Sequence, residues 1–180
     1  MSGLFGIISD HDCAGLLFHG VDYHSHLGTE FGGIAVLGEK FSRQIHVIAQ
    51  SQFKSKFFDD YHRMPGRAGV GVISDSDEQP MYLNSRFGPF CLVTCGLIEN
   101  KDALAAQHLA EGGSFSEMSK GAVNTTELIA KLINQGSSLV DGIERMFAAI
   151  EGSCSLLLLH RDGIYAARDR LGRTPLVVGR

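Results

Sequence analysis

Short apolar runs separated by glycine-rich or polar turns dominate the first half of the chain, a pattern typical of β-strands. Residues 13–27 differ, because their apolar positions recur at roughly helical spacing and predict a helix. A turn at 38–40 lies between two of the runs, which predicts a hairpin. The strands predicted in this half are 4–8, 32–37, 44–50, 68–73 and 90–95.

The second half changes to helical patterns. Residues 102–110 predict a helix that ends at the glycine pair 112–113. Asn124 followed by Glu127 is a capping-box pattern, with an apolar helical face after it. The remaining predictions are a helix over 139–150, a hairpin of strands 153–160 and 164–167 around the turn 161–163, and a last strand at 176–178.

Helices therefore occur in groups rather than alternating with single strands. This order favours an α+β fold of antiparallel sheets with helical layers over a doubly wound parallel sheet. With 180 residues, the chain suits a single domain over 1–180.

Charge and composition narrow the function classes. The net charge of −4 gives no basic footprint for nucleic acid. No apolar run approaches the roughly 20 residues that span a membrane, and the N-terminus lacks the pattern of a signal peptide. Cys13, Cys91, Cys95 and Cys154 lie in apolar surroundings, and C-x₃-C alone is a poor zinc signature. We therefore expect buried free thiols, no metal site and a cytoplasmic protein.

Six segments, in order along the chain, resemble class II glutamine amidotransferases, which use their N-terminal residue as nucleophile. The start Met-Ser-Gly-Leu-Phe-Gly-Ile resembles their Met-Cys-Gly-Ile-Phe-Gly-Ile, and Ala-Arg-Asp-Arg-Leu-Gly near the end resembles Ala-Arg-Asp-Pro-Leu-Gly. The nearest branch is the glutaminase domain of amidophosphoribosyltransferases. The six segments are 1–7, 26–34, 96–100, 126–129, 152–157 and 167–180.

The resemblance implies the four-layer αββα sandwich of Ntn hydrolases and a defined chemistry. Removal of Met1 exposes a Cys whose own α-amino group serves as base. A backbone N–H and an Asn side chain stabilise the oxyanion. An Arg holds the carboxylate of glutamine and an Asp pairs with its ammonium group. No cofactor is implied.

This sequence departs from the family at each of those places. Ser2 stands at the nucleophile, and a hydroxyl is far less acidic than a thiol. Ser74 stands at the Arg and Thr125 at the Asp. Cys95 stands at the oxyanion Asn, so that of the two adjacent oxyanion positions only Gly96 is kept.

Two functions follow from this pattern. In the first, the domain has lost glutaminase activity and is a pseudoenzyme that serves as a binding or regulatory module. Its partner would be a synthase-domain protein or an amino-acid-like small molecule, and an oligomer is possible. In the second, Ser2, native or engineered from Cys, is an active nucleophile that releases ammonia for a synthase such as a phosphoribosyl amidotransferase, or hydrolyses another amide.

Other residues near these positions receive separate expectations. Asp75 lies beside the former substrate pocket, in a loop that we expect to be solvated together with Asp77. Cys95 is either an inert buried thiol or an alternative nucleophile. Arg67 or Arg86 could reach into the pocket and replace the missing Arg. Residues 168–169, Arg-Asp, are expected to tie the last hairpin to the sheets by an ion pair.

Overall fold

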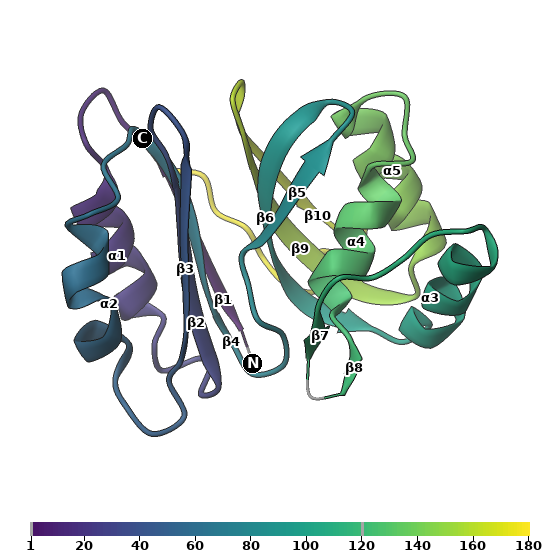
Figure 1. Cartoon of the computed structure of the whole chain (residues 1–180), viewed down its shortest axis with the longest axis horizontal. Helices are drawn as coiled ribbons and strands as arrows, with labels where there is room; N and C mark the ends of the chain where they lie inside the picture. Colours follow the sequence, from purple (N-terminus) through teal and green to yellow (C-terminus); the bar gives the residue numbers. More distant parts are fainter. Residues whose placement is uncertain (1, 120) are drawn as a thin grey trace.

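Two four-stranded antiparallel sheets pack face to face in the computed structural model, which describes residues 2–119 and 121–180 (Figure 1). The N-terminal sheet has the order β1-β4-β2-β3 and the C-terminal sheet the order β10-β9-β6-β5. The strands of the N-terminal sheet are β1 (Gly3–Ile8), β4 (Ala68–Ser74), β2 (Phe31–Leu37) and β3 (Phe41–Val47). Those of the C-terminal sheet are β10 (Gly163–Arg168), β9 (Gly152–His160), β6 (Gly88–Ile98) and β5 (Met81–Ser85).

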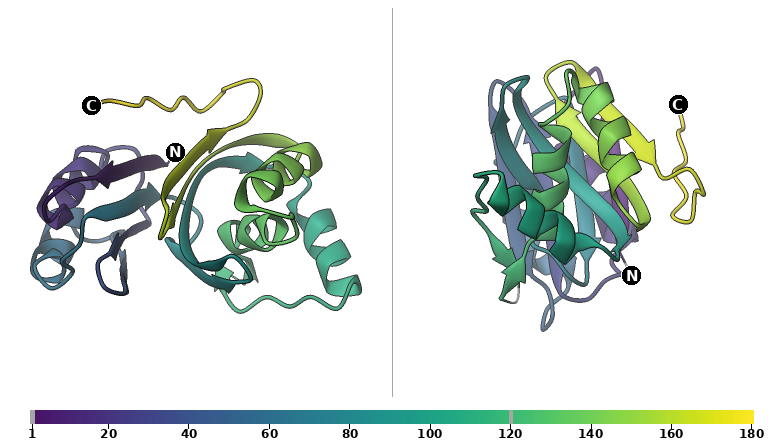
Figure 2. Two further views of the ribbon diagram at one scale, coloured as in Figure 1. Left: turned by 90° about the horizontal axis from the view of Figure 1, so that it is seen from above. Right: turned by 90° about the vertical axis from the view of Figure 1, so that its right-hand side faces the viewer.

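Helices cover the outer face of each sheet (Figures 1 and 2). Helices α1 (Ala14–Tyr23) and α2 (Phe53–Tyr61) lie against the N-terminal sheet. Helices α3 (Lys101–Ala110), α4 (Thr125–Ile133) and α5 (Leu139–Ala149) lie on the side of the C-terminal sheet, as does the small hairpin β7 (Met118–Ser119) and β8 (Ala122–Val123). The expected α+β fold, a four-layer αββα sandwich, is confirmed.

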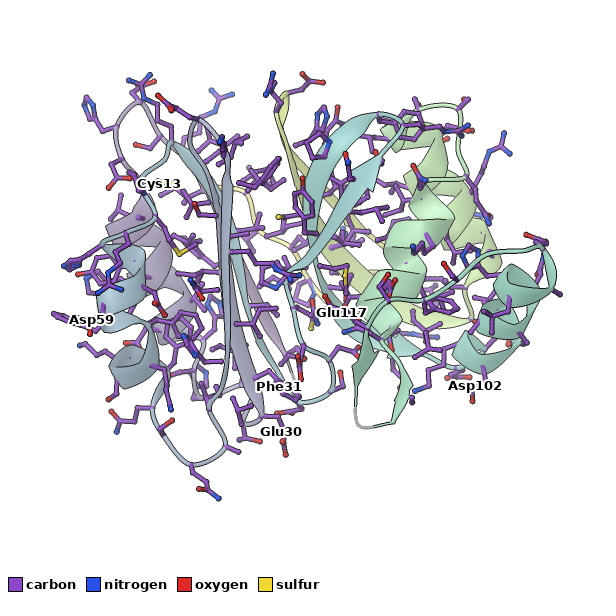
Figure 3. All side chains as sticks on the ribbon, viewed as in Figure 1. Cys13, Glu30, Phe31, Asp59, Asp102 and Glu117 are labelled. Carbon is purple, nitrogen blue, oxygen red and sulfur yellow. The ribbon has the colours of Figure 1, made fainter. Side chains whose placement is uncertain are left out.

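Three apolar cores hold the layers together, one under each helical layer and one between the sheets (Figure 3). Strand β4 serves two of them, because alternate side chains of a strand point to opposite faces. Val70 and Val72 lie between the sheets, whereas Ile73 belongs to the core under α1 and α2. Gly71 faces α1, and a Cβ there would come within 2.4 Å of a methyl of Val21. Glycine therefore lets α1 pack close to the sheet.

Most of the predicted elements are confirmed, with shifts at their ends. The turn at 38–40 is tight, since Leu37 pairs with Phe41, so the second strand of that hairpin begins earlier than predicted and ends at Val47. Helix α2, strand β5 and the hairpin β7–β8 were not predicted. The strand expected at 176–178 is wrong, because the described residues offer it no paired strand and Val177 and Val178 are exposed. None of the described helices has the length and apolar character that crossing a membrane requires.

Candidate functional site

One end of the sandwich gathers residues 2, 74, 95 and 125, and we call it the site end. Gly3 of β1 pairs with Ile73 of β4, and continuing that register places Ser2 beside Ser74. Across the sheets, the Cys95 thiol donates a hydrogen bond of 3.0 Å to the carbonyl oxygen of Ser2. The fold thus brings together side chains that lie far apart in the sequence.

Cys95 is poorly suited to act as a nucleophile or as an oxyanion donor. Burial raises the pKa of its thiol, which keeps it protonated and weakly nucleophilic near neutral pH. Its S–H is already engaged by the Ser2 carbonyl, and a thiol is a weak donor in any case. The structure therefore supports an inert thiol at the position of the oxyanion Asn.

Gly96 has a structural reason to be glycine. Its φ of +150° lies outside the range that side-chain-bearing residues adopt readily. A Cβ there would come within 2.1 Å of the Ser153 carbonyl oxygen on the paired strand β9. The presence of glycine is explained by the pairing of β6 with β9, so its retention is not evidence for an oxyanion site.

Ser74 and Thr125 are joined through Asp77, for which the sequence predicted only a place in a solvated loop. Ser74 is fully buried, and its hydroxyl accepts hydrogen bonds from the N–H groups of Ser76 (3.3 Å) and Asp77 (3.2 Å). The Asp77 carboxylate is only 6% exposed and accepts the Thr125 N–H at 3.3 Å, at the start of α4. The expectation of a solvated loop is therefore wrong for Asp77, because this residue is buried and its carboxylate bonds the N-terminus of α4.

These contacts leave no suitable place for an Arg at residue 74 or an Asp at residue 125, the side chains that the family resemblance implies for binding glutamine. An Arg at Ser74 would have to displace the turn that closes over the Ser74 hydroxyl. An Asp at Thr125 would add a second carboxylate beside Asp77, and like charges at such distances repel.

Asp75 is half-buried and ties the site end to the segment before β2. Its carboxylate accepts hydrogen bonds from the Thr29 N–H (2.7 Å) and the Thr29 hydroxyl (3.2 Å). Burial alone would raise the pKa of this carboxyl, but these hydrogen bonds to the charged form help to bring the net pKa below its usual value. Asp75 thus has a structural role in the loop.

Gln79 completes what we call the strap, residues 74–80. Strand β5 pairs with β6 as far as Met81 opposite Leu92, and the same register would place residue 79 opposite Thr94. There, the side chain of Gln79 accepts the Thr94 N–H (2.7 Å) and donates to the Thr94 carbonyl (3.2 Å). A side-chain amide therefore supplies the two bonds that a longer β5 would make. Pro80 after it was the available sequence signal, since proline cannot donate to a ladder.

Helix α4 begins as the capping pattern predicts, with a further role for Glu127. The Asn124 side chain accepts the Glu127 N–H at 3.1 Å, which confirms the N-cap. The buried Glu127 carboxylate binds the N–H groups of Ser116 (2.8 and 3.1 Å) and Glu117 (2.9 Å). Glu127 therefore anchors the segment before β7 to the start of α4.

Neither arginine that could replace the missing clamp does so. The Arg86 guanidinium donates to the carbonyls of Gln135 and Gly136, beyond the C-terminus of α4. Arg67 is exposed and comes just before β4, at the opposite end of that strand from Ser74. Carboxylate recognition is thus not restored by either side chain.

The ion pair expected at 168–169 is not found among the described residues. Arg168 is exposed, while the carboxylate of the buried Asp169 accepts N–H groups of Cys154 (3.3 Å), Leu171 and Gly172 (2.9 Å each). Asp169 fixes the turn after β10 to β9 through the backbone, so the predicted tie exists but is not ionic.

The cysteine prediction is confirmed for the described chain, where all four thiols are free and buried. No three His, Cys, Asp or Glu side chains gather as metal ligands within residues 2–119 and 121–180. Removal of Met1, which the family's chemistry requires, concerns a residue outside those described.

The fold and the site end together define a class: a two-sheet sandwich in which the residue after Met1 lies where both sheets meet. Residues 67–180 match the family described as the glutamine amidotransferase domain. The chain belongs to that family, as a class II glutamine amidotransferase domain.

Relatives agree over the whole chain. It is 27% identical to the amidophosphoribosyltransferase of Methanocaldococcus jannaschii, covering all of this chain and 40% of that protein. It is 29% identical to the glutamine–fructose-6-phosphate aminotransferase [isomerizing] of Staphylococcus epidermidis, covering 99% of this chain and 30% of that protein. The chain thus spans at most about two fifths of the curated relatives cited here.

A solved structure shows the same fold. The glutamine phosphoribosylpyrophosphate (PRPP) amidotransferase from B. subtilis, complexed with ADP and GMP, superposes with a TM-score of 0.80 at 21% identity. The match covers 94% of this chain and 37% of that one.

Proposed function

We propose that this glutamine amidotransferase domain has no glutaminase activity and serves as a binding or regulatory module. The observation that carries the proposal is the contact of Asp77 with Thr125, together with the turn that Asp77 closes over Ser74. These contacts take up two positions that the family uses to hold glutamine, and Cys95 engages its only donor with Ser2. Four absent groups favour a repurposed scaffold over a single inactivating change.

Ammonia release from glutamine tests the proposal. The intact mass first establishes whether Met1 is removed, because an N-terminal nucleophile requires it. We expect no turnover by the natural chain or by Ser2→Cys, and no heat of glutamine binding in calorimetry. Ser2→Ala is the matched control, since activity that survives in it comes from a contaminant. Turnover that depends on Ser2, or that appears with Ser2→Cys, would overturn the loss of glutaminase chemistry.

We further propose that the partner is a synthase-domain protein. The relatives named above carry this domain within chains more than twice as long, which supports a partner of that kind. Sedimentation of the chain mixed with an amidophosphoribosyltransferase from the same organism should show a complex. Unchanged sedimentation of both components would remove this partner.

A further inference from the structure

A large cavity opens at the end of the sandwich opposite the site end. Strand β1 runs from Gly3 at the site end to Ile8 at the cavity, and β4 runs from Ala68 at the cavity to Ser74. The cavity measures about 1070 Å³, slightly above the usual range of small-molecule pockets. It is lined by the end of β1, the β2–β3 turn, the segment before β4 and the β9–β10 turn, so both sheets contribute.

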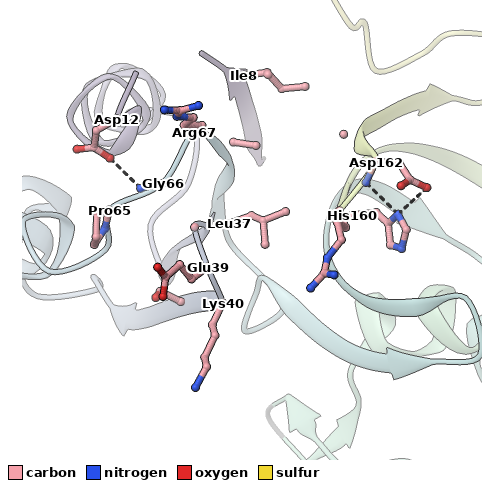
Figure 4. Close-up of a pocket in the computed structure, with 15 residues that line it drawn as sticks. Ile8, Asp12, Leu37, Glu39, Lys40, Pro65, Gly66, Arg67, His160 and Asp162 are labelled. Atoms are coloured by element: carbon pink, nitrogen blue, oxygen red, sulfur yellow. Dashed lines mark hydrogen bonds and ion pairs between the residues drawn. The ribbon is translucent and has the colours of Figure 1, made fainter. Parts of the chain in front are cut away.

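Its walls include apolar side chains from the N-terminal sheet. Ile8 and Leu37 extend toward the hairpin that carries His160 and Asp162 (Figure 4). Ile8, at the end of the edge strand β1, is 62% exposed. An apolar group bound here would remove that surface from water.

Three cations line the same cavity without an ion pair among the described residues: Lys40, Arg67 and Arg161. They come from three separate segments, the tip of one hairpin in each sheet and the chain before β4. Three carboxylates, those of Asp12, Glu39 and Asp162, line the cavity as well, so its lining has as many acidic as basic side chains. Asp12 accepts the Gly66 N–H at 2.8 Å, and Asp162 lies 3.3 Å from His160 (Figure 4).

The opening continues past two of these cations. Lys40 and Arg161 also line a second cavity of about 480 Å³, together with Leu37. Phe41 and Tyr82 form part of its wall. Their rings meet edge to face, with the ring centroids 5.7 Å apart. Lys40 and Arg161 thus line both cavities, the first with apolar walls and the second with aromatic rings. This arrangement suits a ligand with a flat apolar body and an anionic head.

We propose that this end of the domain binds a small amphipathic anion, an aromatic or otherwise apolar molecule that carries a phosphate or carboxylate. Arg161, which lines both cavities, holds the head group, and Ile8 and Leu37 contact the body. Charge-assisted hydrogen bonds from arginine match both head groups. The site does not depend on the proposed loss of glutaminase activity.

Fluorescence titration with anilinonaphthalene sulfonate, an aromatic anion, tests the proposal on the full chain, with calorimetry for the stoichiometry. We expect one bound dye. The double variant Arg67→Gln/Arg161→Gln should weaken binding at least about tenfold, which is the effect of losing a single charge-assisted hydrogen bond. Ile8→Ser should also weaken it, at an exposed position that tolerates the change. Arg63→Gln, an exposed arginine outside the cavity, is the charge-matched control and should leave the affinity unchanged.

The remaining outcomes decide the head group and exclude other occupants. Phenyl phosphate and phenylacetate share an aromatic body, so displacement of the dye by one or both identifies the head group that is held. Equal affinity in the double variant, an equal loss in Arg63→Gln, or displacement by neither competitor would overturn the proposal. A dimer in sedimentation that Ile8→Ser abolishes would also overturn it, because a second copy would then cover the cavity.

Discussion

The amide of Gln79 makes two hydrogen bonds that the backbone would make in a longer β5. Substituting an apolar side chain of the same length measures what these two bonds contribute to the free energy of unfolding. Gln79 is 2% exposed and satisfies both the N–H and the carbonyl of Thr94. Gln79→Met keeps the shape of the side chain and removes only its donor and acceptor, so no large cavity forms. A buried backbone group left without a partner costs about 1–3 kcal/mol. Two such groups predict a loss of about 2–6 kcal/mol.

That loss is a large share of the total stability of a domain, typically about 5–15 kcal/mol. Urea denaturation followed by circular dichroism gives the free energy of unfolding, and its slope shows whether the unfolding transition is preserved. Gln107→Met is the matched control, since Gln107 is exposed on α3 and bonds only the exposed Glu111. If the free energies of unfolding of Gln79→Met and Gln107→Met differ by less than about 0.5 kcal/mol, the Gln79 amide does not complete the sheet.

Three further predictions follow from the same contacts. Gly96→Ala should destabilise the domain by more than about 3 kcal/mol or prevent folding. Gly112→Ala, also at positive φ but with open space around it, should cost about 1 kcal/mol. Comparable losses of the two variants in thermal unfolding would contradict this prediction. Glu127→Gln should lower the free energy of unfolding by about 1–3 kcal/mol and speed amide exchange at 116–117, with the exposed Glu144→Gln unchanged as its control. Burial raises the pKa of the Cys91 thiol from 9.0 to about 12, so a thiol reagent at pH 8 should label it only after unfolding. The contribution of this thiol to stability should be constant below about pH 9 and fall between pH 9 and pH 12. Rapid labelling of the folded chain would refute this.

Local patterns predicted those elements whose boundaries depend on the residues within them. The helix at 102–110 stops at a glycine pair, and the helix after Asn124 begins at its own N-cap. Strand β5 and the strand expected at 176–178 show the opposite case. Each needs a neighbouring strand to accept its hydrogen bonds, and only the fold decides that β6 pairs with 81–85 and that the described residues place no strand beside 176–178.

The sequence by itself determined the family, through motifs spread over the whole chain, and it predicted that the glutamine-handling groups are missing at residues 2, 74, 95 and 125. What stands in their place was decided only by the tertiary structure. Asp77 was expected in a solvated loop and Gln79 carried no prediction, yet both are buried and bonded to residues 48 and 15 positions away in the sequence. The cations Lys40, Arg67 and Arg161 likewise share a cavity only after both sheets have formed. A sequence records which groups a chain carries, but the burial of a carboxylate or the meeting of distant charges depends on long-range packing.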